Sequence, residues 1–452
     1  MLNKRTGISV IVKNIRIEDF DSTLSATLAI NQNFTLNKSL LVSDKPISQP
    51  YWLEYPLHGG TFEVKDQLKI GKAENDPSFE VAIRLSLEGE DFLIKRPVLY
   101  RVTDPVRGDT YQPIAILPKL ELRYSNDNFI SVNSLPVKAR IDLKSNSNDS
   151  ARYSIVQQYS KKWESDQPFF QYNSKEDKYN YKSTEFSSRS GETNTTEEIQ
   201  VKTSNSKFDG YTKTIAYDHI PLITYFPKAK ANLVKLDVKI VGKKIGYIVG
   251  AGDKVPASLE QMGYSVTTLT EADLTEDNLK QYDAIITGIR AYNIHEFLTN
   301  KNEVLKRYVE NGGNLVVQYL KSNQVGQKKV VCGPYPFTID AGTRVTEEDA
   351  AVSFLLPEHP VLNYPNKITA TDFEGWIQER STYQAIRTDE HYELPLAMND
   401  KGEKQSNGSL AIAKYGKGNF VYASLVFFRE LPAGVPGAYR LMANLIALPK
   451  NK

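Results

Sequence analysis

Polar side chains follow three short apolar stretches in the second half of the chain. They are Arg290, Tyr292, Asn293, Gln318 and Arg429. If these stretches are parallel strands of an open sheet, their carboxyl ends meet at one edge, which is where such sheets bind ligands. Arginine recognises anions, while amide and phenol groups hydrogen-bond to polyhydroxylated molecules. The sequence therefore predicts that these five residues bind an anionic or polyhydroxylated ligand.

A second polar segment carries two carboxylates beside an aromatic ring and a guanidinium. Glu374 and Glu379 are candidates for a general acid and base, and Trp376 for a face that stacks on a sugar. Arg380 is a further candidate for ligand binding. In the competing interpretation, Arg290 and Arg380 pair with the two glutamates and only hold a long loop in place. The sequence leaves both interpretations open.

A glycine-rich turn, Gly250-Ala-Gly-Asp-Lys-Val-Pro256, follows a predicted strand and begins a predicted helix. Backbone amides at such a turn can bind phosphate. However, the third glycine of a G-x-G-x-x-G motif would be residue 255, which is valine. Asp253 also places a carboxylate where a phosphate would lie. We interpret the turn as a tight connection with Asp253 as the N-cap, and keep Asp253 among the candidate ligand-binding residues.

The sequence lacks the motifs of several enzyme classes. The sole cysteine, Cys332, is not in a Gly-x-Cys-x-Gly elbow, so glutaminase activity is not expected, although His391-Tyr-Glu393 mimics part of a triad. Cys332 is interpreted as a small apolar core residue. Neither a Gly-x-Ser-x-Gly elbow nor a P-loop occurs.

Metal and cofactor motifs are also missing from the sequence. The histidines are scattered and none forms H-E-x-x-H or H-x-H; they are His58, His219, His295, His359 and His391. A bound metal is therefore not expected. No motif points to a cofactor, and none is predicted.

Length, charge and apolar content limit the classes of protein to which the chain can belong. The chain has 452 residues and a formal net charge of +2, which gives no reason to expect nucleic acid as a partner. The length suggests about three domains. No apolar run is long enough for a transmembrane segment, and the first residues contain no apolar core of a signal peptide.

Hydrophobic patterning changes near residue 235. Before it, apolar and polar residues alternate in short runs, which predicts two antiparallel β-sandwich domains at 1–118 and 119–235. After it, apolar strands alternate with helices, which predicts a flavodoxin-like parallel-sheet domain at 236–452. Its main strands are expected at 244–249, 264–269, 284–287 and 314–318. Its helices are expected at 257–262, 274–281, 300–311 and 439–448.

Several strings resemble the C-terminal region of bacterial PIG-L (LmbE-like) deacetylase-family proteins. They include Ser48-Gln-Pro-Tyr-Trp-Leu53, Asp218-His-Ile-Pro221, Thr287-Gly-Ile-Arg-Ala-Tyr-Asn293, Asp372-Phe-Glu-Gly-Trp-Ile-Gln-Glu-Arg380 and Phe427-Phe-Arg-Glu-Leu-Pro-Ala-Gly-Val-Pro-Gly-Ala-Tyr-Arg-Leu441. The resemblance covers nearly the whole chain. The family's zinc motif, His-Pro-Asp-Asp, does not occur in this sequence.

The resemblance implies a non-catalytic accessory portion that ends in a degenerate class I glutamine amidotransferase-like (ThuA-like) domain. It also implies a carbohydrate ligand, a deacetylase domain of the same or a partner chain, and a periplasmic or extracellular location. The alternative function is a ThuA-like enzyme that acts on a sugar or a related small molecule at the strand edge.

Overall fold

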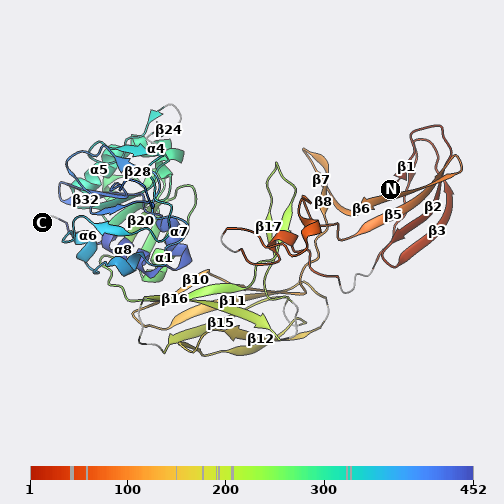
Figure 1. Ribbon diagram of the computed structural model, residues 1–452, viewed down its shortest axis with the longest axis horizontal. Coiled ribbons are helices and arrows are strands. Elements are labelled where there is room, and N and C mark those ends of the chain that lie inside the picture. Colours follow the sequence, from red (N-terminus) through yellow and green to blue (C-terminus); the bar gives the residue numbers. More distant parts are fainter. Residues whose placement is uncertain are drawn as a thin grey trace.

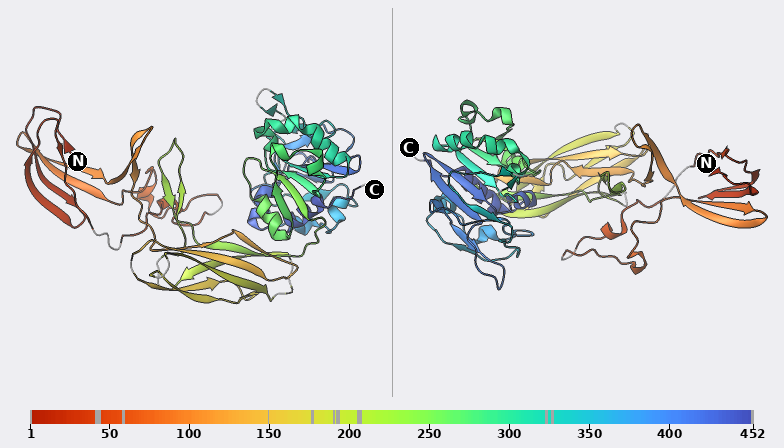
Figure 2. Two further views of the ribbon diagram at one scale, coloured as in Figure 1. Left: turned by 180° about the vertical axis from the view of Figure 1, so that it is seen from behind. Right: turned by 90° about the horizontal axis from the view of Figure 1, so that it is seen from above.

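The structure is a computed structural model that describes residues 2–40, 45–57, 60–148, 150–175, 178–189, 191, 194–204, 208–321, 324–325 and 328–450. Figure 1 shows an N-terminal β unit, a central β unit and a C-terminal unit of helices around a sheet, which we call the α/β unit. Figure 2 shows from two further sides that the central β unit lies between the other two. The protein is therefore rich in β-structure and built from several sheets.

The N-terminal β unit contains one antiparallel four-stranded sheet, in the order β3-β2-β5-β6. Its strands are β2 (Val10–Ile17), β3 (Phe20–Thr27), β5 (Glu80–Leu87) and β6 (Glu90–Pro97). A ribbon of two short strands adds Leu2 and Phe34 to the apolar cluster of this sheet. These strands are β1 (Leu2–Asn3) and β4 (Asn33–Phe34).

The predicted sandwich over 1–118 therefore differs from the observed fold, because a short ribbon replaces a full second sheet. The described part of residues 35–79 forms loops and two 3-10 turns, η1 (Tyr51–Leu53) and η2 (Gln67–Lys69). Four prolines in this stretch remove backbone donors that a sheet needs. A hairpin of β7 (Leu99–Asp104) and β8 (Gly108–Pro113) follows the four-stranded sheet.

The central β unit consists of two sheets that enclose one apolar core. Their strand orders are β10-β19-β16-β12-β14 and β13-β15-β11-β9. The strands are β9 (Leu120–Tyr124), β10 (Asn128–Val132), β11 (Val137–Ser145), β12 (Arg152–Gln158), β13 (Trp163–Ser165), β14 (Phe169–Asn173), β15 (Tyr179–Ser188), β16 (Thr195–Thr203) and β19 (Lys230–Leu236). A further hairpin of β17 (Lys213–Ile215) and β18 (Ile223–Tyr225) pairs outside both sheets.

The α/β unit contains a seven-stranded sheet in the order β21-β20-β22-β23-β32-β31-β29. Its strands are β20 (Lys244–Ile248), β21 (Ser265–Thr268), β22 (Ala284–Thr287), β23 (Asn314–Gln318), β29 (Tyr392–Glu393), β31 (Leu410–Tyr415) and β32 (Gly418–Ala423). The strands from β21 to β32 pair in parallel, as predicted for those at 244–249, 284–287 and 314–318. Strands β31 and β29 are antiparallel. Every residue of β22 and β23 is buried, which explains the apolar runs at 284–286 and 315–317.

Helices cover this sheet, and the buried residues form two apolar clusters. The helices are α1 (Val255–Met262), α2 (Glu276–Leu279), α3 (Ala291–Ile294), α4 (Glu296–Asn300), α5 (Asn302–Glu310), α6 (Pro360–Asn363), α7 (Phe427–Ala433) and α8 (Pro436–Ile446), with 3-10 turns η3 (Glu271–Asp273) and η4 (Ala370–Phe373). Short paired strands complete the unit: β24 (Gln324–Val325), β25 (Lys328–Lys329), β26 (Thr338–Asp340), β27 (Val352–Phe354), β28 (Gln384–Ile386) and β30 (Leu396–Met398). Helix α7 is not among the predicted helices, and it contains Pro432. Among the described helices the longest, α8, has 11 residues, so none could span a bilayer.

The end of α7 contacts the central β unit. The Asn128 amide donates to the main-chain carbonyls of Leu431 and Pro432 at 3.0 and 2.6 Å. The Thr196 hydroxyl donates to the carbonyl of Gly434, and Lys254 pairs with a carboxylate of the central β unit. These bonds join the edge of the five-stranded sheet to the α/β unit.

Candidate functional site

Arg290 lies in a strained turn at the carboxyl edge of the parallel strands. β22 ends at Thr287 and α3 begins at Ala291, and between them Arg290 has a φ of 58°. The left-handed conformation of a non-glycine residue costs about 1–2 kcal/mol and is often found at functional sites. Hydrolases use a strand–turn–helix of this kind to present a nucleophile at the top of a sheet. Here the turn presents a guanidinium instead.

Four buried polar atoms at this edge have no hydrogen-bond partner in the described structure. They are Thr287 Oγ1, Arg290 Nε, Tyr292 Oη and Gln318 Oε1. The side-chain nitrogen of Gln318 is satisfied, since it donates to the Tyr247 hydroxyl at 3.1 Å and to the carbonyl of Thr287 at 3.3 Å. Buried polar groups are nearly always paired in proteins. Thr287, Tyr292 and Gln318 are 0%, 0% and 1% exposed, so only an ordered water or a ligand group that enters the sheet edge could pair with these atoms.

Tyr319 adds an aromatic face between two arginines. Its ring stacks on Tyr383 with centroids 5.6 Å apart and an interplanar angle of 8°, and it contacts Phe428 at 5.3 Å. Burial raises the pKa of Tyr319, while the positive charges of Arg290 and Arg429 oppose this rise. The positive charges of both guanidinium groups therefore favour the ionised form of the same phenol.

Only one of these two arginines has an acidic partner. Arg429 Nε donates to Glu379 Oε1 at 3.1 Å, and its guanidinium also donates to the side chain of Gln378. Within the described ranges, the Arg290 guanidinium makes no ion pair. The edge therefore retains a positive charge that can attract an anion.

Asp253 points into the protein and does not face a ligand. Its carboxylate accepts hydrogen bonds from the Tyr247 hydroxyl at 2.7 Å and from the amides of Val255 and Ile289 at 3.1 and 3.3 Å. The residue that caps α1 is Lys254, which lacks a side-chain cap bond. The predicted N-cap is therefore displaced by one residue, and the carboxylate locks the turn after β20 to the turn after β22.

Gly250 is needed where these two turns touch. A Cβ at Gly250 would lie 2.0 Å from the carbonyl oxygen of Ile289. We expect Gly250→Ala to destabilise the α/β unit by about 1–3 kcal/mol, because the two backbones must separate. Urea unfolding measures the loss. Gly7→Ala serves as the control, since a Cβ there would meet nothing within 4 Å. Equal stability of the two variants would contradict this packing.

Trp376 and Arg380 are buried in the core, so the prediction of a sugar-stacking face at Trp376 is wrong. Trp376 is 2% exposed, stacks on Phe373 with centroids 5.4 Å apart, and donates from its indole to the carbonyl of Asp372 at 2.9 Å. Arg380 is 4% exposed and donates to the carbonyls of Phe373 and Ala350. Burial lowers the pKa of Arg380. Both side chains hold the 370–380 segment against the core instead of facing a ligand.

The two glutamates of this segment do not form an acid–base pair. Glu379 pairs with Arg429 at the strand edge. Glu374 is exposed and lines a different cavity of about 320 Å³, beside Asp372 and Arg440. The interpretation in which Arg290 and Arg380 pair with the two glutamates also differs from the structure. Arg380 donates to main-chain carbonyls, and the arginine that pairs with Glu379 is Arg429.

Glu430 in α7 is a buried acid that sequence reasoning missed. It is 0% exposed, and its two carboxylate oxygens accept from the amide of Ile377 at 3.1 and 3.3 Å. Burial raises the pKa of Glu430 to about 8, against the opposing influence of this hydrogen bond and of Arg380. Its only sequence signal is an acid among apolar residues, which predicts burial only if the segment is known to be helical.

The other residues singled out from the sequence make contacts within the protein. Asn293 Oδ1 accepts from the amide of Lys321 at 2.7 Å. Cys332 lies in an apolar cluster, and burial raises the pKa of its thiol to about 12, which confirms the core interpretation. His391 stacks on Tyr335, with ring centroids 4.1 Å apart. In the described part of the chain no group of acids, histidines or cysteine could hold a metal ion, and His58 lies outside that part.

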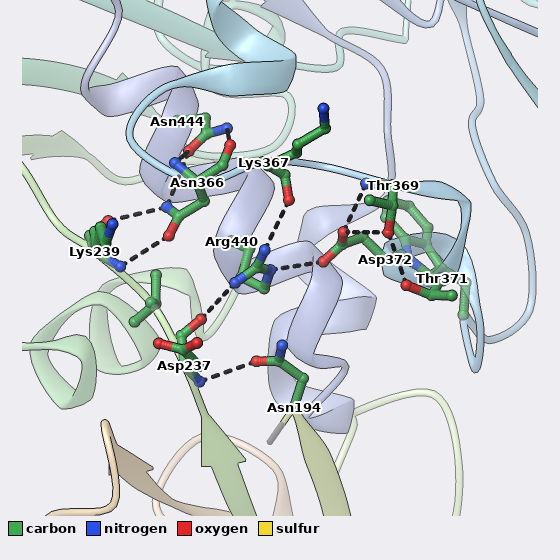
Figure 3. A network of polar contacts seen from close by, with 12 residues as sticks. Asn194, Asp237, Lys239, Asn366, Lys367, Thr369, Thr371, Asp372, Arg440 and Asn444 are labelled. Atoms are coloured by element: carbon green, nitrogen blue, oxygen red, sulfur yellow. Dashed lines mark hydrogen bonds and ion pairs between the residues drawn. The ribbon is translucent and has the colours of Figure 1, made fainter. Parts of the chain in front are cut away.

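Figure 3 shows the polar contacts beside the cavity lined by Glu374. Arg440 of α8 donates to Asp372 Oδ1 at 2.8 Å and to the carbonyls of Asp237 and Lys367 at 2.6 and 2.8 Å. The amide of Asp237 donates in turn to Asn194 of the central β unit at 2.9 Å. The network combines the side chains of Arg440, Asp372 and Asn194 with main-chain groups of Asp237 and Lys367, and it joins the two units.

Comparison with known proteins shows little similarity. No family model matches the chain, and no curated protein matches it. Among solved structures, a β-galactosidase from Rahnella sp. R3 matches at 14% identity with a TM-score of 0.29, over 48% of this chain and 32% of that protein. The match thus spans about a third of the enzyme, and a TM-score this low supports no conclusion about fold or activity.

Proposed function

We propose that the chain is a ligand-binding accessory portion of a PIG-L (LmbE-like) deacetylase-family protein. Its α/β unit would be a flavodoxin-like, degenerate amidotransferase-like domain that binds an anionic, polyhydroxylated molecule such as an acidic sugar. The single observation that carries the proposal is the strained Arg290, which has no ion-pair partner among the described residues, together with the buried atoms of Thr287, Tyr292 and Gln318 that have no partner there. Hydrogen-bond donors and acceptors, together with a positive charge, suit a molecule that carries both a carboxylate and hydroxyl groups.

The strand order supports the flavodoxin-like assignment. The parallel strands run β21-β20-β22-β23-β32, which corresponds to the order 2-1-3-4-5 of doubly wound sheets. The point where this order reverses lies between β20 and β22, and there Asp253 and the contact at Gly250 fill the crevice. Binding is therefore proposed one strand farther along, at β22 and β23.

Binding without catalysis fits these residues better than the alternative, a ThuA-like enzyme acting on a sugar. Glu374 and Glu379 lie in different surroundings, and Cys332 is a buried thiol with a high pKa. The proposed partners are a carbohydrate and a deacetylase domain of the same or another chain. A periplasmic or extracellular location belongs to this proposal and follows from the family resemblance alone.

Replacing Arg290 with methionine should weaken binding of an acidic sugar. Calorimetric titration of the full chain with glucuronate and galacturonate, with glucose as the uncharged comparison, measures the affinity. A hydrogen bond to a charged group contributes about 1.5–3 kcal/mol, so we expect a loss of roughly tenfold or more. Arg307→Met is the matched control, because Arg307 lies exposed on α5 and pairs with Glu276.

Two results would count against the proposal. In the first, glucose binds as well as the uronates, so that charge plays no part. In the second, Arg307→Met weakens binding as much as Arg290→Met, which would place the anion elsewhere on the surface.

A further inference from the structure

A cavity of about 650 Å³ lies beside the two hairpins, between the N-terminal and central β units. Figure 1 shows the β7–β8 hairpin and β17 in this region. Five parts of the chain line the cavity, near residues 48–52, 73–80, 97–99, 113–115 and 220–224. It is separate from the strand edge of the α/β unit, and the function proposed above does not use it.

Hydrogen bonds between the lining segments hold the cavity open. The amide of Ile116 donates to the Ser48 hydroxyl at 2.8 Å, and the Ser78 hydroxyl donates to the carbonyl of Ile114 at 2.8 Å. Gln49 joins the 48–52 segment to the end of the β17–β18 hairpin, since its side-chain oxygen accepts from the amide of Phe226 at 2.8 Å. The walls are therefore fixed before any ligand arrives, which lowers the entropic cost of binding.

The walls are mainly apolar and poor in hydrogen-bond donors. Five of the lining residues are prolines, which have no backbone N–H: Pro50, Pro77, Pro97, Pro113 and Pro221. Two lining side chains that have hydrogen-bond donors already donate to the protein. The Ser78 hydroxyl donates to the carbonyl of Ile114, and the Asn75 amide donates to the carbonyl of Gln49 at 2.7 Å. Trp52 provides a half-buried aromatic face. An anion would find few partners in such a site.

The charged residues that line the cavity are acidic. Asp76 pairs with Lys72 at 2.9 Å and Glu80 pairs with Lys95 at 3.1 Å. Glu74 has no ion pair in the ranges that the structure describes. The cavity therefore combines an apolar body with one uncompensated carboxylate at its border.

We propose that this cavity binds an apolar or aromatic molecule that carries one ammonium group. The apolar body would pack on Trp52 and the proline walls, and the ammonium would pair with Glu74. The volume lies within the range of small-molecule sites, about 300–1,000 Å³, and such sites are often found between domains. The ligand supplies the hydrogen-bond donors and the positive charge that the cavity lacks.

The tryptophans make this proposal directly testable. Trp52 is half-buried, whereas Trp163 and Trp376 are 3% and 2% exposed, so an added small molecule should act mainly on Trp52 emission. The full chain is titrated with phenethylamine, with 2-phenylethanol as the neutral analogue and with 3-phenylpropionate as the anionic one. We expect a saturable change with phenethylamine, a weaker one with the alcohol and none with the carboxylate. Trp52→Phe should remove the signal.

Substitution of the carboxylate separates charge recognition from simple apolar binding. Glu74→Gln should weaken phenethylamine binding by about two- to fivefold, as for an ion pair at an exposed carboxylate, and leave binding of 2-phenylethanol unchanged. Glu63→Gln, at an exposed glutamate outside the cavity lining, should change neither. The proposal is overturned if phenethylamine gives no saturable change, if 3-phenylpropionate binds equally well, or if Glu74→Gln leaves the affinity for the amine intact.

Discussion

Replacing Arg440 with alanine is expected to destabilise the α/β unit by about 3–5 kcal/mol, because it leaves a buried carboxylate without its counter-ion. The side chains of Arg440 and Asp372 are only 14% and 8% exposed, and their N–O distance is 2.8 Å. The substitution also removes the donors to the carbonyls of Asp237 and Lys367, which Figure 3 shows converging on the same guanidinium. Asp372 additionally caps η4, so its charge stays fixed in place.

Urea unfolding followed by Trp376 emission measures this loss. In a background with Trp52→Phe and Trp163→Phe, Trp376 reports on the α/β unit alone, which avoids treating a protein of several units as a single transition. Arg307→Ala is the matched control within the same unit, because Arg307 pairs with Glu276 where the two side chains are 53% and 52% exposed. That exposed pair should contribute at most about 1 kcal/mol.

A second comparison tests the cause of the Arg440 effect. Adding Asp372→Asn to Arg440→Ala should recover part of the lost stability, since the unpaired charge is removed while an amide oxygen can still accept from the amide of Thr369. If the double variant is as unstable as the single one, the loss arises from packing of α8 and not from the buried charge.

Glu430→Gln should remove a strong pH dependence from the stability of the α/β unit. The pKa of Glu430 is raised from 4.5 to about 8 by burial. Between these pH values the Glu430 carboxyl is ionised in the unfolded chain and protonated in the folded one. The free energy of unfolding of the wild type therefore falls as pH rises. The slope is about 1.4 kcal/mol for each pH unit in this interval, and it flattens above pH 8.

The charges that face Glu430 from neighbouring elements are those of Arg380, Arg429 and Glu348. Glutamine keeps an oxygen that can accept from the amide of Ile377, so the variant removes the titration and preserves the bond. Urea midpoints measured from pH 5 to pH 9 should diverge, with the variant more stable at alkaline pH. Glu374→Gln, at an exposed acid, should follow the wild type. Parallel curves for wild type and Glu430→Gln would show that Glu430 is ionised in the folded state at neutral pH.

The sequence alone determined the features that depend on neighbouring residues. Strands β20, β22 and β23 were predicted from runs of apolar residues, because a strand buried on both faces needs such a run. The helix predicted at 257–262 ends before Gly263, which adopts a φ of 105°, a conformation that costs glycine little. The carboxyl edge with Arg290 and Gln318 follows from these strands, since parallel strands end on the same side.

Only the tertiary structure decided which polar and aromatic side chains face solvent. Trp376 and Glu374 are two residues apart in sequence, yet Trp376 packs on Phe373 and Phe427 while Glu374 lines a surface cavity. Glu430 becomes a buried acid because the 377–380 segment, about fifty residues earlier, closes over α7. Asp253 turns inward because Ile289, thirty-six residues away, supplies an amide. Hydrophobic periodicity reports on contacts within one element, whereas burial of a single side chain depends on a partner segment whose position the local sequence does not specify.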